Sequence, residues 1–171
     1  IIDVGAGAST LVDGLVRAGY HQITLLDVSA TALRHTQQRL LNTLPAAAHS
    51  VASRHADVLT AALRTNAFDV WHDRAVFHFL TDAANRDQYV KQVRGALRNG
   101  GHVVVATFAD DGPTRCSGLD VQSYSPNALQ SAFGPEFRLV EDHREEHRTP
   151  WEAIQAFTYC LFQYHPAQQD A

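Results

Sequence analysis

Short apolar, β-rich runs alternate along the chain with segments of helical periodicity. The first run, Ile1–Val4, leads into a segment that places Leu11, Leu15 and Val16 on one helical face. Strands that alternate with helices favour a parallel sheet with helices on both faces. The pattern predicts strands at 1–4, 23–27, 51–57, 68–72 and 102–108, and helices at 10–18, 30–44, 60–64, 83–97 and 126–133.

The last two apolar runs, 137–145 and 153–164, differ from the earlier ones because no helical segment separates them. A short turn near Thr149 and Pro150 joins them, which predicts an antiparallel hairpin. The pattern therefore predicts one α/β domain over residues 1–165, followed by a frayed tail at 166–171. Ser29, Asp82 and Ser125 precede helical segments and are candidate N-caps.

Composition and charge narrow the function classes. The chain has 171 residues with a net charge of −4, which disfavours a broad nucleic-acid interface. It has no apolar run of roughly 18 residues, the length that a membrane-spanning helix needs. Cys116 and Cys160 are far apart and have no metal or redox spacing, so we expect a cytoplasmic protein.

The chain contains no methionine and opens inside an apolar strand pattern. We therefore expect an N-terminal segment to precede Ile1 in a longer protein. Removal of an initiator methionine is the alternative.

A glycine-rich turn follows the first strand, where Gly5 and Gly7 precede the first helix. Glycine is needed where the backbone turns sharply or a ligand approaches closely. The second strand ends at Asp27, and a carboxylate at this place in a doubly wound fold accepts hydrogen bonds from ribose hydroxyls. The segment therefore predicts a nucleoside-bearing cofactor.

Two residues distinguish between cofactor classes. A dinucleotide site prefers G-x-G-x-x-G, which would require glycine in place of Thr10. The carboxylate of Asp3 suits a cationic ligand and would repel a pyrophosphate. Both observations favour S-adenosylmethionine, which carries an ammonium and a sulfonium, over a nicotinamide or flavin dinucleotide.

On these motifs the sequence resembles the class I S-adenosylmethionine-dependent methyltransferases over nearly its whole length. The resemblance implies a Rossmann-like, doubly wound, seven-stranded and mostly parallel α/β sheet with a C-terminal antiparallel hairpin and strand order 3-2-1-4-5-7-6. Ser9 stands where the family often has a third glycine. The matching segments are 2–9, 26–29, 55–58, 68–74 and 98–103.

The resemblance also implies site residues. In the family the acid at the second strand end binds the ribose, and the acid and next residue at the third contact adenine. As alternatives, Asp27 and Asp57 cap helices, and Asp3 bonds loop amides. The residues implied to bind the cofactor are Asp3, Gly5, Ala6, Gly7, Asp27, Val28, Ser29, Asp57, Val58, Asp73 and Arg74.

Asp73 and His78, after the fourth strand, are the candidate catalytic residues, because open α/β sheets place their chemistry at the carboxyl ends of strands. For Asp73 the alternative is an ion pair or a cap. His78 is either a general base or a packed residue among aromatic neighbours. His143, Glu145 and His147 would share one face of a strand, but without an established ligand spacing, so no metal is expected.

The leading hypothesis is methyl transfer by in-line displacement to a small-molecule acceptor. A protein lysine is the alternative acceptor, because the Asp73–Arg74 step resembles that of some protein-lysine methyltransferases. A nicotinamide-dependent oxidoreductase and a non-catalytic cofactor-binding domain are further alternatives. Against the oxidoreductase, the chain has no Tyr-x-x-x-Lys pair around its sole lysine, Lys91.

Overall fold

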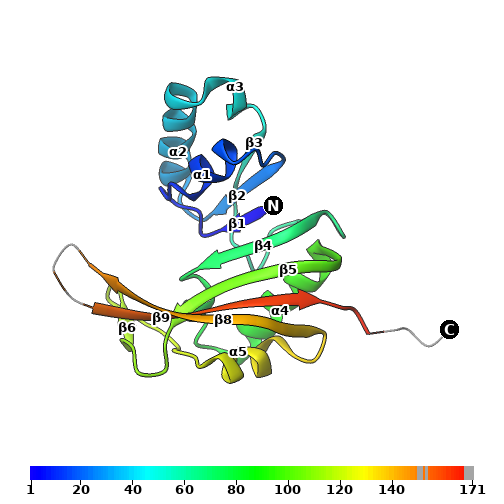
Figure 1. The fold of residues 1–171 in the computed structure, drawn as a ribbon, viewed down its shortest axis with the longest axis vertical. Helices are drawn as coiled ribbons and strands as arrows, with labels where there is room; N and C mark the ends of the chain where they lie inside the picture. Colours follow the sequence, from blue (N-terminus) through cyan, green and yellow to red (C-terminus); the bar gives the residue numbers. More distant parts are fainter. Residues whose placement is uncertain (150–151, 153, 168–171) are drawn as a thin grey trace. The chain divides into compact units, whose positions relative to one another are not determined.

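The computed structural model describes residues 1–149, 152 and 154–167 of the chain. The chain divides into two compact units, Ile1–Ala62 and Leu63–Ala171, and each is described by itself (Figure 1). None of the helices in the described part of the chain is long and apolar enough to cross a membrane.

The first unit is a three-stranded parallel sheet with its helices. Strands β1 (Ile2–Val4), β2 (Ile23–Asp27) and β3 (Val51–His55) pair in the order β3-β2-β1. The helices are α1 (Leu11–Arg17), α2 (Ala30–Thr43) and the short α3 (Pro45–Ala48). A core of buried apolar side chains joins strands and helices; it contains Ala6, Val12, Val16, Ile23, Leu25, Leu33, Leu40 and Val51.

The second unit holds a four-stranded mixed sheet in the order β4-β5-β9-β8. Strands β4 (Phe68–Arg74) and β5 (Leu97–Phe108) are parallel, whereas β8 (Phe137–Arg148) and β9 (Ile154–Tyr164) form the antiparallel hairpin. Its remaining elements are the 3-10 turn η1 (Phe77–Phe79), α4 (Ala83–Ala96), α5 (Pro126–Phe133), and the two-stranded ribbon of β6 (Arg115–Cys116) and β7 (Leu119–Asp120).

Aromatic side chains fill the core of the second unit. Phe77 packs against the rings of Tyr89, Tyr124 and Phe133 at centroid distances of 5.0, 5.4 and 5.2 Å. Phe133 also stacks on Phe162 of β9 at 5.2 Å. These contacts join η1, α4 and α5 to one another and to β9.

The complete strand order is β3-β2-β1-β4-β5-β9-β8, with β8 and β9 antiparallel. This order confirms the predicted sheet, including its reversed last strand. The predicted N-caps are also confirmed: the side chain of Ser29 accepts from the Ala32 amide, Asp82 from Ala84, and Ser125 from Ala128.

The structure corrects two predicted elements. Residues 60–64 do not form a helix; they follow a turn in which the Thr60 and Ala61 amides donate to the Asp57 carbonyl. Helix propensity over so few residues is a weak signal that the tertiary context overrides. The predicted strand at 102–108 begins earlier, at Leu97, because Leu97 already pairs with Phe68 and the next pair joins His102 to Val70.

Elements α3, η1, β6 and β7 were not predicted, because each is too short to show a periodicity. The predicted final hairpin is confirmed, but Pro150 of its turn lies outside the described residues. So do residues 168–171 of the predicted tail.

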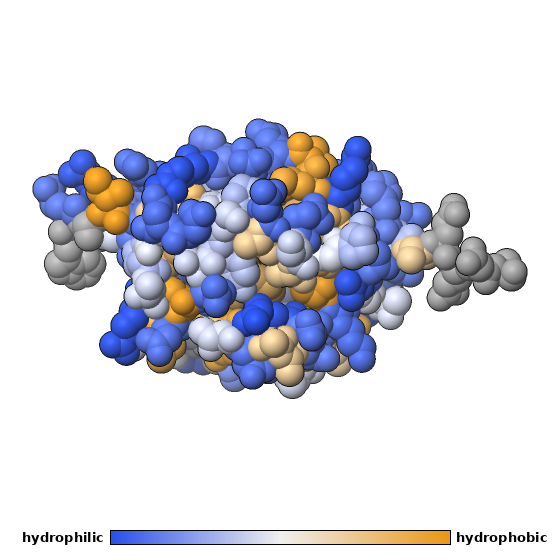
Figure 2. All heavy atoms as spheres, turned by 90° about the horizontal axis from the view of Figure 1, so that it is seen from below, coloured by the Kyte–Doolittle hydropathy of each residue, from blue (hydrophilic) through white to orange (hydrophobic). Residues whose placement is uncertain are grey.

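Large apolar side chains at the surface are scattered. Figure 2 shows one face on which hydrophilic residues predominate and hydrophobic ones form small separate areas. Among the described residues, the exposed large apolar ones are Tyr20, Val28, Leu41, Leu119, Val140 and Ile154. Scattered residues of this kind are ordinary, but Val28 directly follows Asp27 at the end of β2.

Candidate functional site

The glycine loop after β1 is anchored to the end of β2 through its amides. The Gly5 and Ala6 amides both donate to the Leu26 carbonyl, at 2.8 and 3.3 Å. The Gly7 amide donates to Oδ2 of Asp27 at 2.8 Å. Asp27 therefore points towards the loop, as predicted for a carboxylate that serves a ligand bound there.

Gly5 and Gly7 supply backbone conformations that other residues adopt at a cost, with φ of +66° and +48°. A Cβ built on Gly7 would lie 3.6 Å from Oδ2 of Asp27, an ordinary van der Waals contact. The requirement for glycine at position 7 is therefore conformational rather than a matter of space.

Asp27 is held on both sides. Its Oδ1 accepts from the Ser29 amide at 2.7 Å, and Ser29 in turn caps α2. The carboxylate is thus fixed between the loop and the start of α2. The side chain therefore orders the turn into α2 and also faces the loop, whereas α2 is capped by Ser29 and not by Asp27. Ribose binding by Asp27 stays a prediction.

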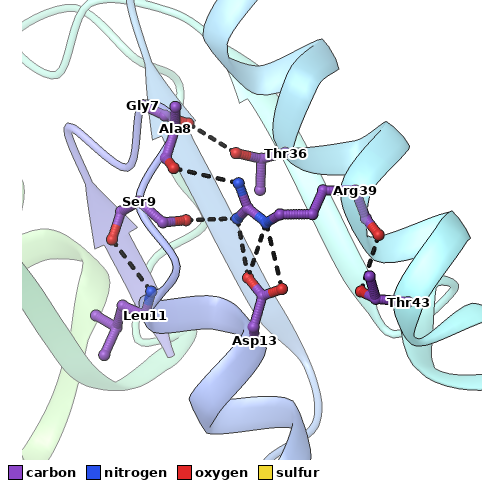
Figure 3. Close-up of polar contacts among 8 residues, drawn as sticks. All are labelled: Gly7, Ala8, Ser9, Leu11, Asp13, Thr36, Arg39 and Thr43. Carbon is purple, nitrogen blue, oxygen red and sulfur yellow. Dashed lines mark hydrogen bonds and ion pairs between the residues drawn. The ribbon is translucent and has the colours of Figure 1, made fainter.

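The opposite side of the loop is held by α2 (Figure 3). The Thr36 hydroxyl donates to the Gly7 carbonyl at 3.0 Å. Arg39 donates to the Ala8 and Ser9 carbonyls at 3.2 and 2.6 Å. The sequence analysis missed both residues, because nothing in a helical pattern marks a side chain that reaches a distant loop.

Further predicted cofactor-binding residues lie after β2 and β3: Val28 follows β2, and Asp57 and Val58, which were predicted to contact adenine, follow β3. The apolar side chain of Val28 is 68% exposed, and its carbonyl lies 3.0 Å from Nε2 of His55. Oδ1 of Asp57 accepts from the Leu59 amide at 2.8 Å, whereas Val58 is buried. Asp3, in β1, is also buried.

In the second unit, Asp73 organises the turn that follows β4. Its Oδ1 accepts from the Val76 amide at 2.8 Å, and its Oδ2 from the Phe77 amide at 3.0 Å. The Tyr89 hydroxyl donates to the same Oδ2 at 2.5 Å, and the indole of Trp71 donates to the Tyr89 oxygen at 2.8 Å. The side chain of Asp73 is completely buried.

This burial raises the pKa of Asp73 to about 6, although the hydrogen bonds from Tyr89, Val76 and Phe77 act to lower it. Burial also raises the pKa of Tyr89 well above its usual value, and the neighbouring Asp73 carboxylate adds to the effect. Both oxygens of Asp73 are engaged by protein donors. The geometry gives the residue a structural role, and its predicted contact with the methyl donor stays a prediction that this geometry does not support.

Arg74 points away from Asp73. Its Nε donates to the Tyr159 hydroxyl at 2.9 Å, and its guanidinium lies 4.5 Å from the centre of the Phe157 ring. The Asp73–Arg74 step is therefore a turn-forming carboxylate followed by an arginine held on β9.

His78 is fully buried in η1, between the rings of Phe79 and Phe108 at 4.5 and 4.8 Å. Within the described residues neither ring nitrogen has a hydrogen-bond partner. Burial, together with the positive charge of Arg74, lowers its pKa to about 4. The packing fits the predicted alternative of a core histidine; its role as a general base stays a prediction.

The structure thus brings together, within the first unit, Gly5, Ala6, Gly7, Asp27 and Ser29. This region also agrees with a known family. A family model described as a methyltransferase domain matches residues 2–103. The chain belongs to this family. The match begins at β1 and includes the glycine loop, Asp27, Asp57 and the turn after β4 of this methyltransferase domain.

An uncharacterized methyltransferase from Mycobacterium tuberculosis is 30% identical to the domain over 108 residues, 63% of this chain and 50% of that protein. The chain therefore spans about half the length of the curated relatives it matches.

Solved structures share the fold. A SAM-dependent methyltransferase from Methanosarcina mazei superposes with a TM-score of 0.75 at 13% identity, covering 96% of this chain and 91% of that one. The 1,6-didemethyltoxoflavin-N1-methyltransferase of Burkholderia thailandensis, with bound 1,6-didemethyltoxoflavin and S-adenosylhomocysteine, gives 0.74 at 18% identity, covering 96% and 70%. At these identities the likeness concerns the fold alone.

Proposed function

We propose that this methyltransferase domain binds S-adenosylmethionine at the glycine loop and transfers its methyl group to a small-molecule acceptor. The observation that carries the proposal is the carboxylate of Asp27, fixed at 2.8 Å from the Gly7 amide with its other oxygen on the Ser29 amide. A carboxylate oxygen can accept two hydrogen bonds. Each oxygen of Asp27 can therefore take one ribose hydroxyl besides the amide it already holds.

The loop suits a cationic donor better than a dinucleotide. A pyrophosphate is bound largely by backbone amides at a helix start. Here the Gly5, Ala6 and Gly7 amides already donate to the Leu26 carbonyl and to Asp27. A phosphate at the loop would also face the Asp27 carboxylate, whereas a sulfonium or ammonium would be attracted to it.

Val28 supports the same ligand. Its side chain is 68% exposed beside the proposed ribose carboxylate. Covering this apolar surface with an adenine ring would remove it from water, which is favourable. We therefore assign Val28 to the adenine end of the donor and Asp27 to the ribose.

Bound S-adenosylmethionine supplies an activated methyl group with its own leaving group. The protein is left to align donor and acceptor and to exclude water. In this chain, the loop amides and Asp27 orient the ribose, and Val28 shields the base. No proton transfer through His78 or Asp73 belongs to the proposal, because both side chains are buried.

A small-molecule acceptor is proposed for two reasons. The structural neighbour from Burkholderia thailandensis holds a small acceptor together with S-adenosylhomocysteine. The alternative, a protein lysine, was suggested by the Asp73–Arg74 step, but Asp73 is bonded to backbone amides and Arg74 to Tyr159. Both side chains are thus engaged by groups of the domain itself, which supports the small-molecule acceptor.

Calorimetric titration with S-adenosylhomocysteine tests donor binding. We expect a micromolar Kd for the wild type and a loss of roughly 100-fold or more in Asp27→Ala, which removes two charge-assisted hydrogen bonds to ribose. Asp69→Asn is the matched control, because it removes an exposed carboxylate that pairs with Arg98 in the second unit. The proposal would be contradicted if the wild type did not bind at millimolar ligand, or if Asp27→Ala bound the ligand as tightly as the wild type.

Radiolabel transfer from S-adenosylmethionine tests the acceptor class. Incubated with an extract separated into small-molecule and protein fractions, the protein should label the small-molecule fraction, and Asp27→Ala should not. If label appears only in a protein band, the acceptor is a protein and the proposal of a small-molecule acceptor is wrong. The proposal that the domain binds the donor would still stand.

A further inference from the structure

We infer that Thr36 and Arg39 of α2 are positioning residues that hold the glycine loop in its donor-binding conformation. The inference rests on the proposed function, since it assigns two further residues to the same site. Neither residue belongs to the loop or to the strand ends, and neither would touch the donor.

The two side chains hold three consecutive carbonyls. The Thr36 hydroxyl donates to Gly7 at 3.0 Å, and Arg39 donates to Ala8 at 3.2 Å and to Ser9 at 2.6 Å. Thr36 and Arg39 are three positions apart on α2, so they share one helical face. Figure 3 shows both side chains directed at the loop from this face.

Asp13 of α1 completes the arrangement. Nε of Arg39 lies 3.2 Å from both carboxylate oxygens of Asp13, and its NH2 group lies 2.9 Å from Oδ2. The side chain of Asp13 is only 7% exposed and that of Arg39 27%. The negative charge of Asp13 balances the positive charge of Arg39. The guanidinium therefore holds the loop without a net positive charge that would repel a cationic donor.

The loop is thus anchored on two sides. Its amides are bonded at the end of β2, and its carbonyls are bonded to α2. Gly7 carries one bond of each kind, because its amide donates to Asp27 while its carbonyl accepts from Thr36. A single residue therefore connects the Thr36 hydroxyl to the proposed ribose carboxylate.

A purely structural role would produce the same contacts, so the test must separate binding from stability. Thr36 is almost completely buried. Replacement by valine keeps the shape and removes the hydroxyl, and replacement by serine keeps the hydroxyl and removes a methyl group. Both changes disturb the core, but only one removes the bond to Gly7.

We expect Thr36→Val to raise the Kd for S-adenosylhomocysteine about tenfold or more, and Thr36→Ser to stay within about twofold of the wild type. Binding should follow the hydroxyl, whatever the Tm of each variant. Thr43→Val is the matched control on the same helix, because the Thr43 hydroxyl donates only to the Arg39 carbonyl within α2. It should bind as the wild type does.

Arg39→Lys provides a second variant in case Thr36→Val fails to fold. Lysine keeps the charge beside Asp13, but its single ammonium cannot reach the carboxylate and two carbonyls in the fixed fork of a guanidinium. We expect its Kd to rise about fivefold, and the KM for S-adenosylmethionine to rise in proportion while kcat changes little. Hydrogen exchange without ligand should be faster at the Gly7 amide in Thr36→Val than in Thr36→Ser.

Equal Kd values for Thr36→Val, Arg39→Lys and the wild type would overturn the inference while the proposed function stands. The same holds if Kd follows Tm rather than the hydroxyl. A wild type that does not bind S-adenosylhomocysteine would overturn the proposed function, and with it the role assigned to the two residues.

Discussion

At the scale of single residues, the structure separates groups that the sequence placed side by side. Asp73 and Arg74 are neighbours in β4, yet Asp73 closes the turn through the Val76 and Phe77 amides while Arg74 lies on Phe157. Ala75, which directly follows Arg74, has a φ of +68°, a backbone conformation that is energetically unfavourable for a residue other than glycine. The bonds to Asp73 hold this turn in place.

His78 provides a prediction about pH. In the unfolded chain a histidine binds its proton below pH of about 6.5, whereas burial holds the pKa of native His78 at about 4. Between these values the unfolded state binds more protons, so stability falls as the pH falls. The free energy of unfolding of His78→Leu, relative to that of the wild type, should therefore rise by about 2 kcal/mol as the pH is lowered from 7 to 4.5.

Urea unfolding at several pH values measures this difference. Asp73 titrates in both proteins, so its contribution cancels in the comparison. At pH 7 the variant should be at least as stable as the wild type, because leucine replaces a buried ring without hydrogen-bond partners among the described residues. Parallel stability curves would show that His78 is not held uncharged.

At the scale of elements, the start of β5, directly after α4, shows how close backbone atoms exclude a side chain. Residues 98–101 stand opposite the single residue Asp69, so the strand bulges there. A Cβ on Gly101 would lie 2.9 Å from the Arg98 carbonyl oxygen and 3.1 Å from that of Asp69. Neither atom can move without displacing a strand.

Two glycine substitutions test this picture. Gly101→Ala should lower the free energy of unfolding by about 1–3 kcal/mol, a range typical of overpacking. Gly95→Ala is the matched control within α4, because nothing lies within 4 Å of its added Cβ; it should stabilise by about 0.5–1 kcal/mol. Thermal unfolding of both variants gives the comparison. Equal effects of the two changes would contradict the close approach at Gly101.

At the scale of the whole molecule, the residues predicted to bind the donor lie within the region that matches the methyltransferase family. The matched region, residues 2–103, contains the glycine loop and every strand end predicted to serve the donor. The hairpin β8–β9 lies outside that match, yet it provides Tyr159 and Phe157, which hold Arg74. The C-terminal hairpin thus fixes a residue next to the predicted reaction site.

Much of the fold could be predicted because its signals are local. Apolar periodicity identified the strands and long helices, and Ser29, Asp82 and Ser125 marked helix starts, since a cap depends on residues within one turn. The prediction of a helix at 60–64 was wrong for the same reason: it rested on local composition alone, which the tertiary context overrides.

The sequence by itself predicted the alternation of strands and helices, the glycine turn and the helix caps, because each depends on neighbours along the chain. The strand order was expected only from the resemblance to a known family, and the role of Asp27 from that resemblance and from the place of such a carboxylate in doubly wound folds. Only the tertiary structure decided what Thr36, Arg39 and Tyr89 do, because each bonds a partner many positions away: Gly7, Ser9 and Asp73. It also decided that Asp73 and His78 are buried. A carboxylate or an imidazole has the same letter whether it faces a ligand or the core, and only packing distinguishes the two.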